Sequence, residues 1–344
     1  MDMRGNFTRQ EIYSQPEAWS EALASIKDQL HPIQSLWEDS KYAQIIFTGC
    51  GSTYYLAMAS AALFQELSGL PARALPGSEL WLYPKSSYPQ SGRVLLVAVS
   101  RSGETSETLN ACQAFNESGQ GDLVTLSCYP EMPLAKIGIL NLVFPSGAEQ
   151  SVAQTRAFST LYLATLGLTA LWAGRPDLLA ALDRLPTAGR RVLEKYTSLA
   201  QSLGQRMEFD RFYILGSGPR YGLACELSLK MKEMSLSHSE PFHFLEFRHG
   251  PKAMVTPSTL VIGLVSGANY AQESGVLAEM SALRGQVLEV GENGRDVAFE
   301  SGIDEDIYNI LYLPTVQLLA FEHSMAKGLN PDRPYNLEAV VRLQ

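Results

Sequence analysis

The chain has 344 residues, of which 46% are hydrophobic and 18% charged, and its formal net charge is -9. This length suits one large domain or two smaller ones, and the acidic balance without a Lys/Arg-rich run argues against a nucleic-acid partner. No apolar stretch approaches the roughly 20 residues of a membrane span, and the first residues lack the apolar core of a signal peptide. Four scattered cysteines form no metal-binding motif, so we expect a cytoplasmic protein without a metal.

The first 40 residues are predicted to be helical, because Pro16 suits a helix start and Trp19, Leu23 and Ile26 recur at helical spacing. Residues 45–67 combine a short apolar strand, a Gly-x-Gly turn and a helical pattern. The same order of strand, turn and helix follows at 93–115. Further short strands are expected at 123–127 and 140–145.

The second half repeats the first. Gly49 and Gly51 correspond to Gly216 and Gly218 at an offset of 167, and strands are expected again near 212–216, 258–265, 286–290 and 309–314. Continuous apolar strands that alternate with helices are typical of a parallel sheet covered on both faces. We therefore predict an α/β fold of two tandem doubly wound parallel-sheet domains, flavodoxin-like in class. The predicted boundaries are a helical N-terminal segment at 1–40, a first domain at 41–175, a helical linker at 176–207, and a second domain with the tail at 208–344.

A loop rich in hydroxyls follows the strand that ends near residue 99, with the sequence SRSGETSET. Ligands of open α/β sheets bind at the carboxyl ends of the strands, where the N-terminus of the next helix favours an anion. Ser100, Ser102 and Thr105 offer hydroxyls to the oxygens of a phosphate, and Ser52 and Thr53 in the earlier glycine turn offer two more. The alternative is a helix cap, which needs only one hydroxyl.

Three motifs in order, GCGST, SRSGETSET and GAEQSVAQTRAFST, resemble the sugar isomerase (SIS) domain as found in the isomerase half of glucosamine-6-phosphate synthase. The resemblance covers nearly the whole chain and implies a sugar phosphate as ligand, with no cofactor. It further implies the binding residues. The phosphate would be held by Ser52, Thr53, Ser100, Arg101, Ser102 and Thr105, and the sugar by Gly51, Glu149 and Val152.

The helical pattern that follows the second glycine turn places Glu226, Lys230, Glu233 and Ser237 along one face, at i, i+4, i+7 and i+11. By itself this spacing is more typical of solvated Glu–Lys pairs, and a His before Gly-Pro is usually a loop residue. The KMKE and RHGP segments, however, resemble the KLKE helix and KHGP loop of the SIS enzymes. The resemblance implies that Glu233 moves a proton between C1 and C2 of an open-chain sugar, and that Lys230 offers positive charge to the oxyanion. It also implies that His249 opens the sugar ring from the neighbouring subunit of a homodimer. Arg248 and Lys252 flank this His, and the sequence favours neither a role toward the charge of the substrate nor a place on the surface.

The sequence departs from the synthase at two places. Asp2 follows Met1 where the synthase has a nucleophilic Cys, so we expect no glutaminase domain. Ala339 stands where the synthase tail has a lysine that forms a Schiff base, and alanine forms no imine.

Residues 10–19 and the segment FRHGPK at 247–252 resemble stand-alone amino-sugar-phosphate deaminase/isomerases. We therefore expect a phosphosugar aldose–ketose isomerase that acts on glucosamine or galactosamine 6-phosphate, either as an isomerase alone or with deamination. The alternative from another class is a non-catalytic sugar-phosphate sensor.

Overall fold

The structure of the protein is a computed structural model, and it describes residues 4–343. The chain divides into two compact units. Unit 1 comprises Gln150–Thr155, Arg184–Leu337 and the chain up to Pro16, whereas unit 2 comprises Glu17–Glu149, Arg156–Asp183 and the chain from Glu338 onward. The tail thus belongs to unit 2, although the predicted boundaries group it with the second domain; those boundaries stay a prediction. The Met1–Asp2 pair, on which the glutaminase argument rests, lies outside the described residues.

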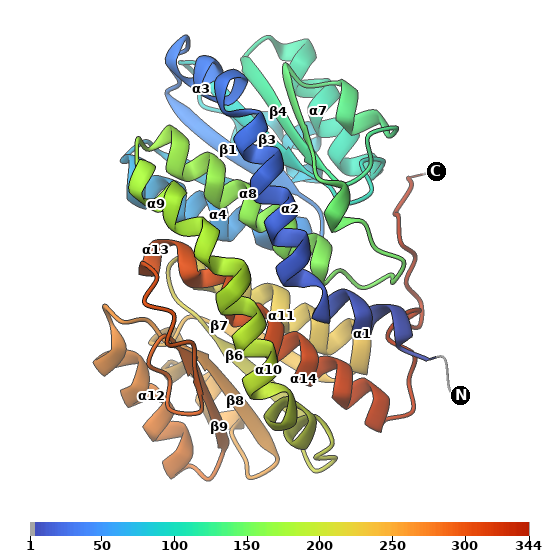
Figure 1. Cartoon of the computed structure of the whole chain (residues 1–344), viewed down its shortest axis with the longest axis vertical. Coiled ribbons are helices and arrows are strands. Elements are labelled where there is room, and N and C mark those ends of the chain that lie inside the picture. Colours follow the sequence, from blue (N-terminus) through green and yellow to red (C-terminus); the bar gives the residue numbers. More distant parts are fainter. Residues whose placement is uncertain (1–3, 344) are drawn as a thin grey trace. The chain divides into compact units, whose positions relative to one another are not determined.

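Unit 2 is built on a parallel sheet with the strand order β2-β1-β3-β4-β5 (Figure 1). Its strands are β1 (Gln44–Gly49), β2 (Ala72–Pro76), β3 (Val94–Val99), β4 (Gly121–Ser127) and β5 (Leu140–Val143). Its helices are α2 (Gln15–Asp28), α3 (Leu30–Glu38), α4 (Ser52–Ser68), α5 (Gly77–Leu82), α6 (Pro84–Ser87), α7 (Ser106–Ser118), α8 (Arg156–Trp172) and α9 (Pro176–Ala181).

Successive residues of β1 point to opposite faces of this sheet, and both faces are covered by helices. Ile46 packs in a cluster with Leu80 of α5 and Phe115 of α7. Its neighbour Phe47 instead approaches Phe64 of α4, with ring centroids 6.1 Å apart. Helices on both faces leave no side of the central strands for water, which explains why β1 and β3 are continuous apolar runs.

Unit 1 repeats this plan with the order β10-β9-β8-β6-β7, again all parallel (Figure 1). Its strands are β6 (Arg211–Leu215), β7 (His238–Phe242), β8 (Thr259–Leu264), β9 (Gln286–Gly291) and β10 (Val297–Ala298). Its helices are α1 (Asn6–Tyr13), α10 (Leu185–Gly204), α11 (Pro219–Ser235), α12 (Tyr270–Ala282), α13 (Glu305–Tyr308) and α14 (Leu313–Ala326). Tyr213 and Val261 pack against α12, whereas Phe212 contacts His323 of α14 on the other face. The predicted fold of two doubly wound parallel sheets is confirmed.

The glycine turns of the two repeats, which lie 167 residues apart, have the same backbone conformation at their second glycine. Gly51 and Gly218 both have φ of 57°, and α4 and α11 begin directly after them. A Cβ at either position would meet nothing within 4 Å, so the backbone angle and not crowding requires glycine. The two turns occupy the carboxyl ends of β1 and β6, the edge at which ligands of such sheets bind.

One predicted strand is wrong. Residues 309–314 form a short 3-10 turn, Asn309–Tyr312, followed by the start of α14. The segment is buried on all sides, and a buried apolar run does not distinguish a strand from a helix. Pro314, in the first turn of α14, is the residue that favours the helix. The strand position next to β9 is taken instead by the two-residue β10.

Two further edge strands, besides β10, were not predicted. β2 and β7 have the sequences ARALP and HSEPF, which lack a continuous apolar run because one side of each strand has no neighbour. Each contains a proline, which is tolerated at an edge because no second strand needs its N–H.

Candidate active site

Three hydroxyl groups gather in unit 2 at the loop Ser100–Thr105, which joins β3 to α7 and is called the hydroxyl loop below. The Ser100 Oγ and the Ser102 Oγ lie 3.3 and 3.4 Å from the Thr105 Oγ1. The backbone N–H of Gly103 donates to the Ser100 Oγ, and that of Glu104 donates to the Ser102 Oγ. A helix cap uses a single hydroxyl, so the convergence of three at a helix N-terminus favours the interpretation as an anion site.

Arg101, predicted to contact the phosphate, is almost fully buried and pairs with Glu149, predicted to contact the sugar. The Nη1 of Arg101 lies 3.4 Å from the Glu149 Oε2, and the Glu149 side chain is completely buried. A hydrogen bond of 3.2 Å also joins the Arg101 Nη2 to the carbonyl of Ala339. The structure thus brings these two predicted site residues together, next to the hydroxyl loop.

Ser52 and Thr53 begin α4, directly after the glycine turn at Gly51, and both are buried. The hydroxyl of Thr53 closes this turn: it accepts from the backbone N–H of Cys50 and donates to the Cys50 carbonyl, each at 3.0 Å. Thr53 therefore has a structural task in the turn, and its role toward a phosphate stays a prediction.

The C-terminal tail lies along the hydroxyl loop. The backbone N–H of Ser106, the first residue of α7, donates to the Val341 carbonyl, and Arg342 pairs with Glu104 at 2.7 Å. Ala339, at the position of the family's lysine, contributes its backbone carbonyl to Arg101. The tail thus reaches the predicted substrate loop, but Ala339 brings no amine to it.

A buried row of charges runs along α11 in unit 1: Glu226, Lys230 and Glu233, called the Glu–Lys–Glu row. The Nζ of Lys230 lies 3.3 Å from the Glu226 Oε1 and 2.5 Å from the Glu233 Oε2. Glu226 and Lys230 are completely buried, and Glu233 is 19% exposed. This argues against the interpretation as solvated surface pairs. Ser237, predicted to extend the row, lies beyond the end of the helix at Ser235.

Lys230 keeps its charge inside the protein. Burial by itself would lower the pKa of Lys230, but the two neighbouring carboxylates outweigh burial and raise the pKa above its ordinary value. A buried lysine held between Glu226 and Glu233 fixes the orientation of both carboxylates. In this geometry Lys230 positions Glu233, and its predicted action on the oxyanion of a substrate stays a prediction.

His249 and its neighbours lie on the surface of unit 1. The His249 side chain is exposed, and its backbone N–H donates to the Glu246 carbonyl at 2.9 Å. Arg248 and Lys252 both pair with Glu279 of α12, at 2.7 and 3.7 Å. The sequence leaves open whether these cations serve the substrate or the surface, and the exposed pairing favours a surface role.

Val152, also predicted to contact the sugar, belongs to unit 1. It is half-buried, and its backbone N–H donates to the Asp332 carbonyl at 3.0 Å.

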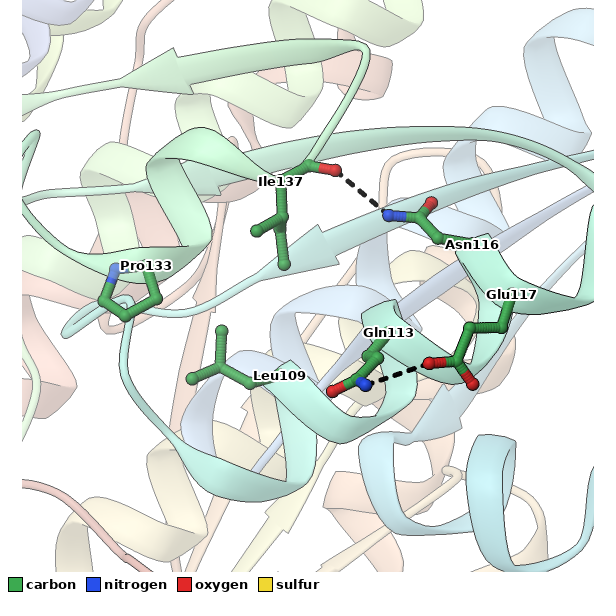
Figure 2. Close-up of a pocket in the computed structure, with 6 residues that line it drawn as sticks. All are labelled: Leu109, Gln113, Asn116, Glu117, Pro133 and Ile137. Carbon is green, nitrogen blue, oxygen red and sulfur yellow. Dashed lines mark hydrogen bonds between the residues drawn. The ribbon is translucent and has the colours of Figure 1, made fainter.

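A hollow of about 370 Å³ on unit 2 lies along α7 rather than at the hydroxyl loop (Figure 2). It is lined by Leu109, Gln113, Asn116, Glu117, Pro133 and Ile137. Its polar side chains are engaged locally, since Gln113 donates to Glu117 and Asn116 donates to the Ile137 carbonyl. The hollow offers no converging donors to an anion, and we do not assign it to the active site.

Within residues 4–343, no group of three or more His, Cys, Asp or Glu side chains is arranged to hold a metal ion. None of the helices in this range combines the length and the hydropathy needed to cross a membrane. The four cysteines are all free thiols.

Comparison with known proteins identifies the family. A model described as SIS domain matches residues 39–171 and 208–288, which together are more than half of the chain. The chain belongs to the SIS domain family and carries two copies of the domain, one in each predicted half.

Relatives and solved structures extend the comparison. Glutamine–fructose-6-phosphate aminotransferase (isomerizing) of Pyrobaculum aerophilum is 30% identical over 98% of this chain and 58% of its own length, so the chain spans a little over half of such relatives. The solved glucosamine-6-phosphate deaminase of Thermotoga maritima is 28% identical, with a TM-score of 0.76 over 94% of this chain and 100% of its own. Tagatose-6-phosphate ketose/aldose isomerase of Escherichia coli is 22% identical, which shows a likeness of fold, with a TM-score of 0.85 over 96% of this chain and 97% of its own.

Proposed function

We propose that the protein is a phosphosugar aldose–ketose isomerase that acts on an amino-hexose 6-phosphate, with release of ammonia as part of its reaction. The hydroxyl loop binds the phosphate, and Glu233 transfers the proton. The single observation that carries this proposal is the Glu–Lys–Glu row, because Glu226 and Lys230 are fully buried while Glu233 alone is partly exposed. Burying an ion costs on the order of several kcal/mol, so a buried row whose exposed end is a carboxylate suits a functional base better than a structural pair.

The proposed chemistry needs one carboxylate. Glu233 takes the C2 hydrogen of the open-chain sugar as a proton, and the electron pair forms the C1–C2 double bond. The C1=O double bond opens at the same time, and its oxygen takes up a proton from solvent, which gives an enediol or enolamine. Return of the proton from Glu233 to C1, with loss of a proton from the C2 hydroxyl or amino group to solvent, gives the ketose or, where C2 carries nitrogen, the C2 imine. Water adds to that imine and ammonia leaves, which balances the deamination. Lys230 holds the Glu233 carboxylate in place throughout.

The similarity to a deaminase and to aminotransferases supports an amino sugar as substrate, and the similarity to a ketose/aldose isomerase supports the common isomerisation step. Ala339 supplies no amine, so the proposed reaction proceeds without an imine between the tail and the ketose. His249 opens the ring, and we propose that it acts from the partner subunit of a homodimer, since its side chain is exposed on its own unit.

The test is turnover of glucosamine 6-phosphate and galactosamine 6-phosphate, with the ketose phosphate and ammonia measured in parallel. We expect one of the two substrates to yield both products in equal amounts. Ketose formation from the non-amino hexose phosphates, without ammonia from either amino sugar, would restrict the protein to isomerisation. Binding of these sugars without any turnover would contradict the proposal and favour a sensor.

A further inference from the structure

The second repeat carries a loop at the same place as the hydroxyl loop. Ser266–Asn269 follows β8 and precedes α12, as Ser100–Gly103 follows β3, and the offset of 166 pairs Ser100 with Ser266. The chemistry of the loop has changed, because Gly267 and Ala268 stand where the first repeat has Arg101 and Ser102. This second loop has therefore lost the cation and a hydroxyl that we assign to phosphate binding.

A carboxylate of the protein itself is bound at the second loop. The Glu305 Oε2 accepts the backbone N–H groups of Gly267 and Ala268, each at 3.1 Å. Glu305 begins α13 and is distant in the sequence, so this is not a local turn. Two adjacent backbone N–H groups that converge on one oxygen form the arrangement that binds a phosphate oxygen in open α/β proteins.

A buried arginine completes the second site. The Nη1 of Arg220 lies 2.9 Å from the Glu305 Oε1, and the Nη2 lies 3.4 Å from Glu273, which in turn accepts the N–H of Ser266 at 2.6 Å. At the offset of 167, Arg220 replaces Thr53 of the first glycine turn. The second repeat thus places a cation where the first repeat has one of the hydroxyls predicted to bind phosphate.

We propose that the second repeat is an anion site closed by the protein's own Glu305 carboxylate, so that the chain binds a phosphate monoester at the first repeat only. The Glu305 side chain is 29% exposed, whereas those of Arg220 and Glu273 are 7% and 4% exposed. Removal of Glu305 therefore opens the loop to solvent while Arg220 keeps its partner Glu273. A phosphate oxygen then takes the place of the Glu305 Oε2. The binding of a phosphate monoester at the first repeat rests on the proposed function, whereas the closure of the second repeat by Glu305 does not.

The experiment separates the two repeats by measuring inorganic phosphate bound per chain in equilibrium dialysis with radiolabelled phosphate. The starting protein is the double variant Ser100→Ala/Ser102→Ala, which lacks the first site and is expected to bind no phosphate. Addition of Glu305→Ala is expected to create one site per chain. The matched control is Glu208→Ala, which removes an exposed glutamate of the same unit that pairs only with a surface arginine in the described contacts, and should create none.

A folded Glu305→Ala protein that binds no phosphate would overturn the proposal. A second measurement needs no variant: the unaltered chain should bind one phosphate, and two per chain would overturn the proposal even where Glu305→Ala fails to fold. If the unaltered chain binds none, the proposed function fails at the first repeat, whereas a site gained with Glu305→Ala would still support closure of the second.

Discussion

The two repeats place a similar loop at the end of a similar strand and use it in opposite ways. In the first repeat, Ser100, Ser102 and Thr105 direct hydroxyls toward one another and leave an anion to come from solution. In the second, the Glu305 carboxylate already occupies the backbone donors. A duplicated fold can thus give its two copies different roles: we assign substrate binding to the first repeat and the reacting carboxylate, on α11, to the second.

The largest expected effect concerns the carboxylate in the second repeat. Glu233→Gln keeps the size of the side chain but removes the base, so kcat should fall by roughly 10²- to 10⁴-fold while the affinity for the sugar phosphate changes little. Steady-state kinetics and direct binding measure the two quantities separately. Glu208→Gln, an exposed glutamate in the same unit, is the control. Activity equal to that of the parent would remove Glu233 from the mechanism.

The assignment of His249 to a partner subunit is tested by mixing two inactive proteins, Glu233→Gln and His249→Asn. In a mixed dimer, one site combines an intact Glu233 with an intact His249 from the other chain, and the second site has neither. Random exchange of subunits should restore roughly a quarter of the parent activity. If His249 serves its own chain, every site in the mixture lacks one of the two residues, and activity stays absent.

The loops themselves are compared by exchanging one residue in each. Ser102→Ala removes a hydroxyl from the phosphate, and hydrogen bonds to charged groups contribute about 1.5–3 kcal/mol, so substrate affinity should fall by roughly 10- to 100-fold. Ala268→Ser places a hydroxyl at the matching position of the closed loop and should leave affinity unchanged. The measurement is binding of the sugar phosphate to both variants. Equal losses in the two variants would mean that both loops bind substrate.

The smallest expected effect is on the stability of unit 1 in mild acid. Burial lowers the pKa of His323 below its usual 6.5, Lys327 acts in the same direction, and the hydrogen bond to the Gly204 carbonyl opposes them. The unfolded chain therefore takes up the proton first, and the free energy of unfolding should decline as the pH falls through about 6.5 until it reaches the lower folded-state pKa.

Chemical denaturation of the parent and of His323→Gln at a series of pH values measures this decline. In His323→Gln, the free energy of unfolding should decline less as the pH falls below about 6.5 than it does in the parent. His31→Gln, at an exposed position in unit 2, should behave as the parent does. A decline of the same size in parent and His323→Gln would show that other groups cause it.

The central strands and the hydroxyl loop were predictable because their signals are local. A continuous apolar run followed by a polar turn marks β1, β3, β6 and β8 without ambiguity, and the repeat confirms each strand by its copy. The strand predicted at 309–314 was wrong because burial on all sides erases the hydrophobic periodicity that distinguishes a helix from a strand. The edge strands β2 and β7 were missed because an edge strand needs fewer apolar residues, and its sequence therefore lacks the continuous apolar run of a central strand.

In the candidate site, too, the features set by local sequence were predictable, whereas burial and long-range contacts were not. The position of Glu233 on α11 follows from helical spacing, but exposed and buried Glu–Lys rows have the same spacing, so the burial of Lys230 was not predictable from it. The closure of the second loop depends on Glu305, whose partners Gly267 and Arg220 are far from it in the sequence. The one available signal was the repeat itself, which places Arg220 at the position of Thr53.

Incorporation of deuterium from heavy water into the sugar carbons is the decisive test of Glu233 as the base, because it reports proton transfer whether or not ammonia leaves. Nuclear magnetic resonance of glucosamine 6-phosphate or galactosamine 6-phosphate incubated with the parent protein should show exchange at C1 or C2. Ser102→Ala should regain the parent rate at saturating substrate, and Glu233→Gln should show exchange slowed by roughly 10²- to 10⁴-fold. Exchange by Glu233→Gln at the parent rate would contradict the account.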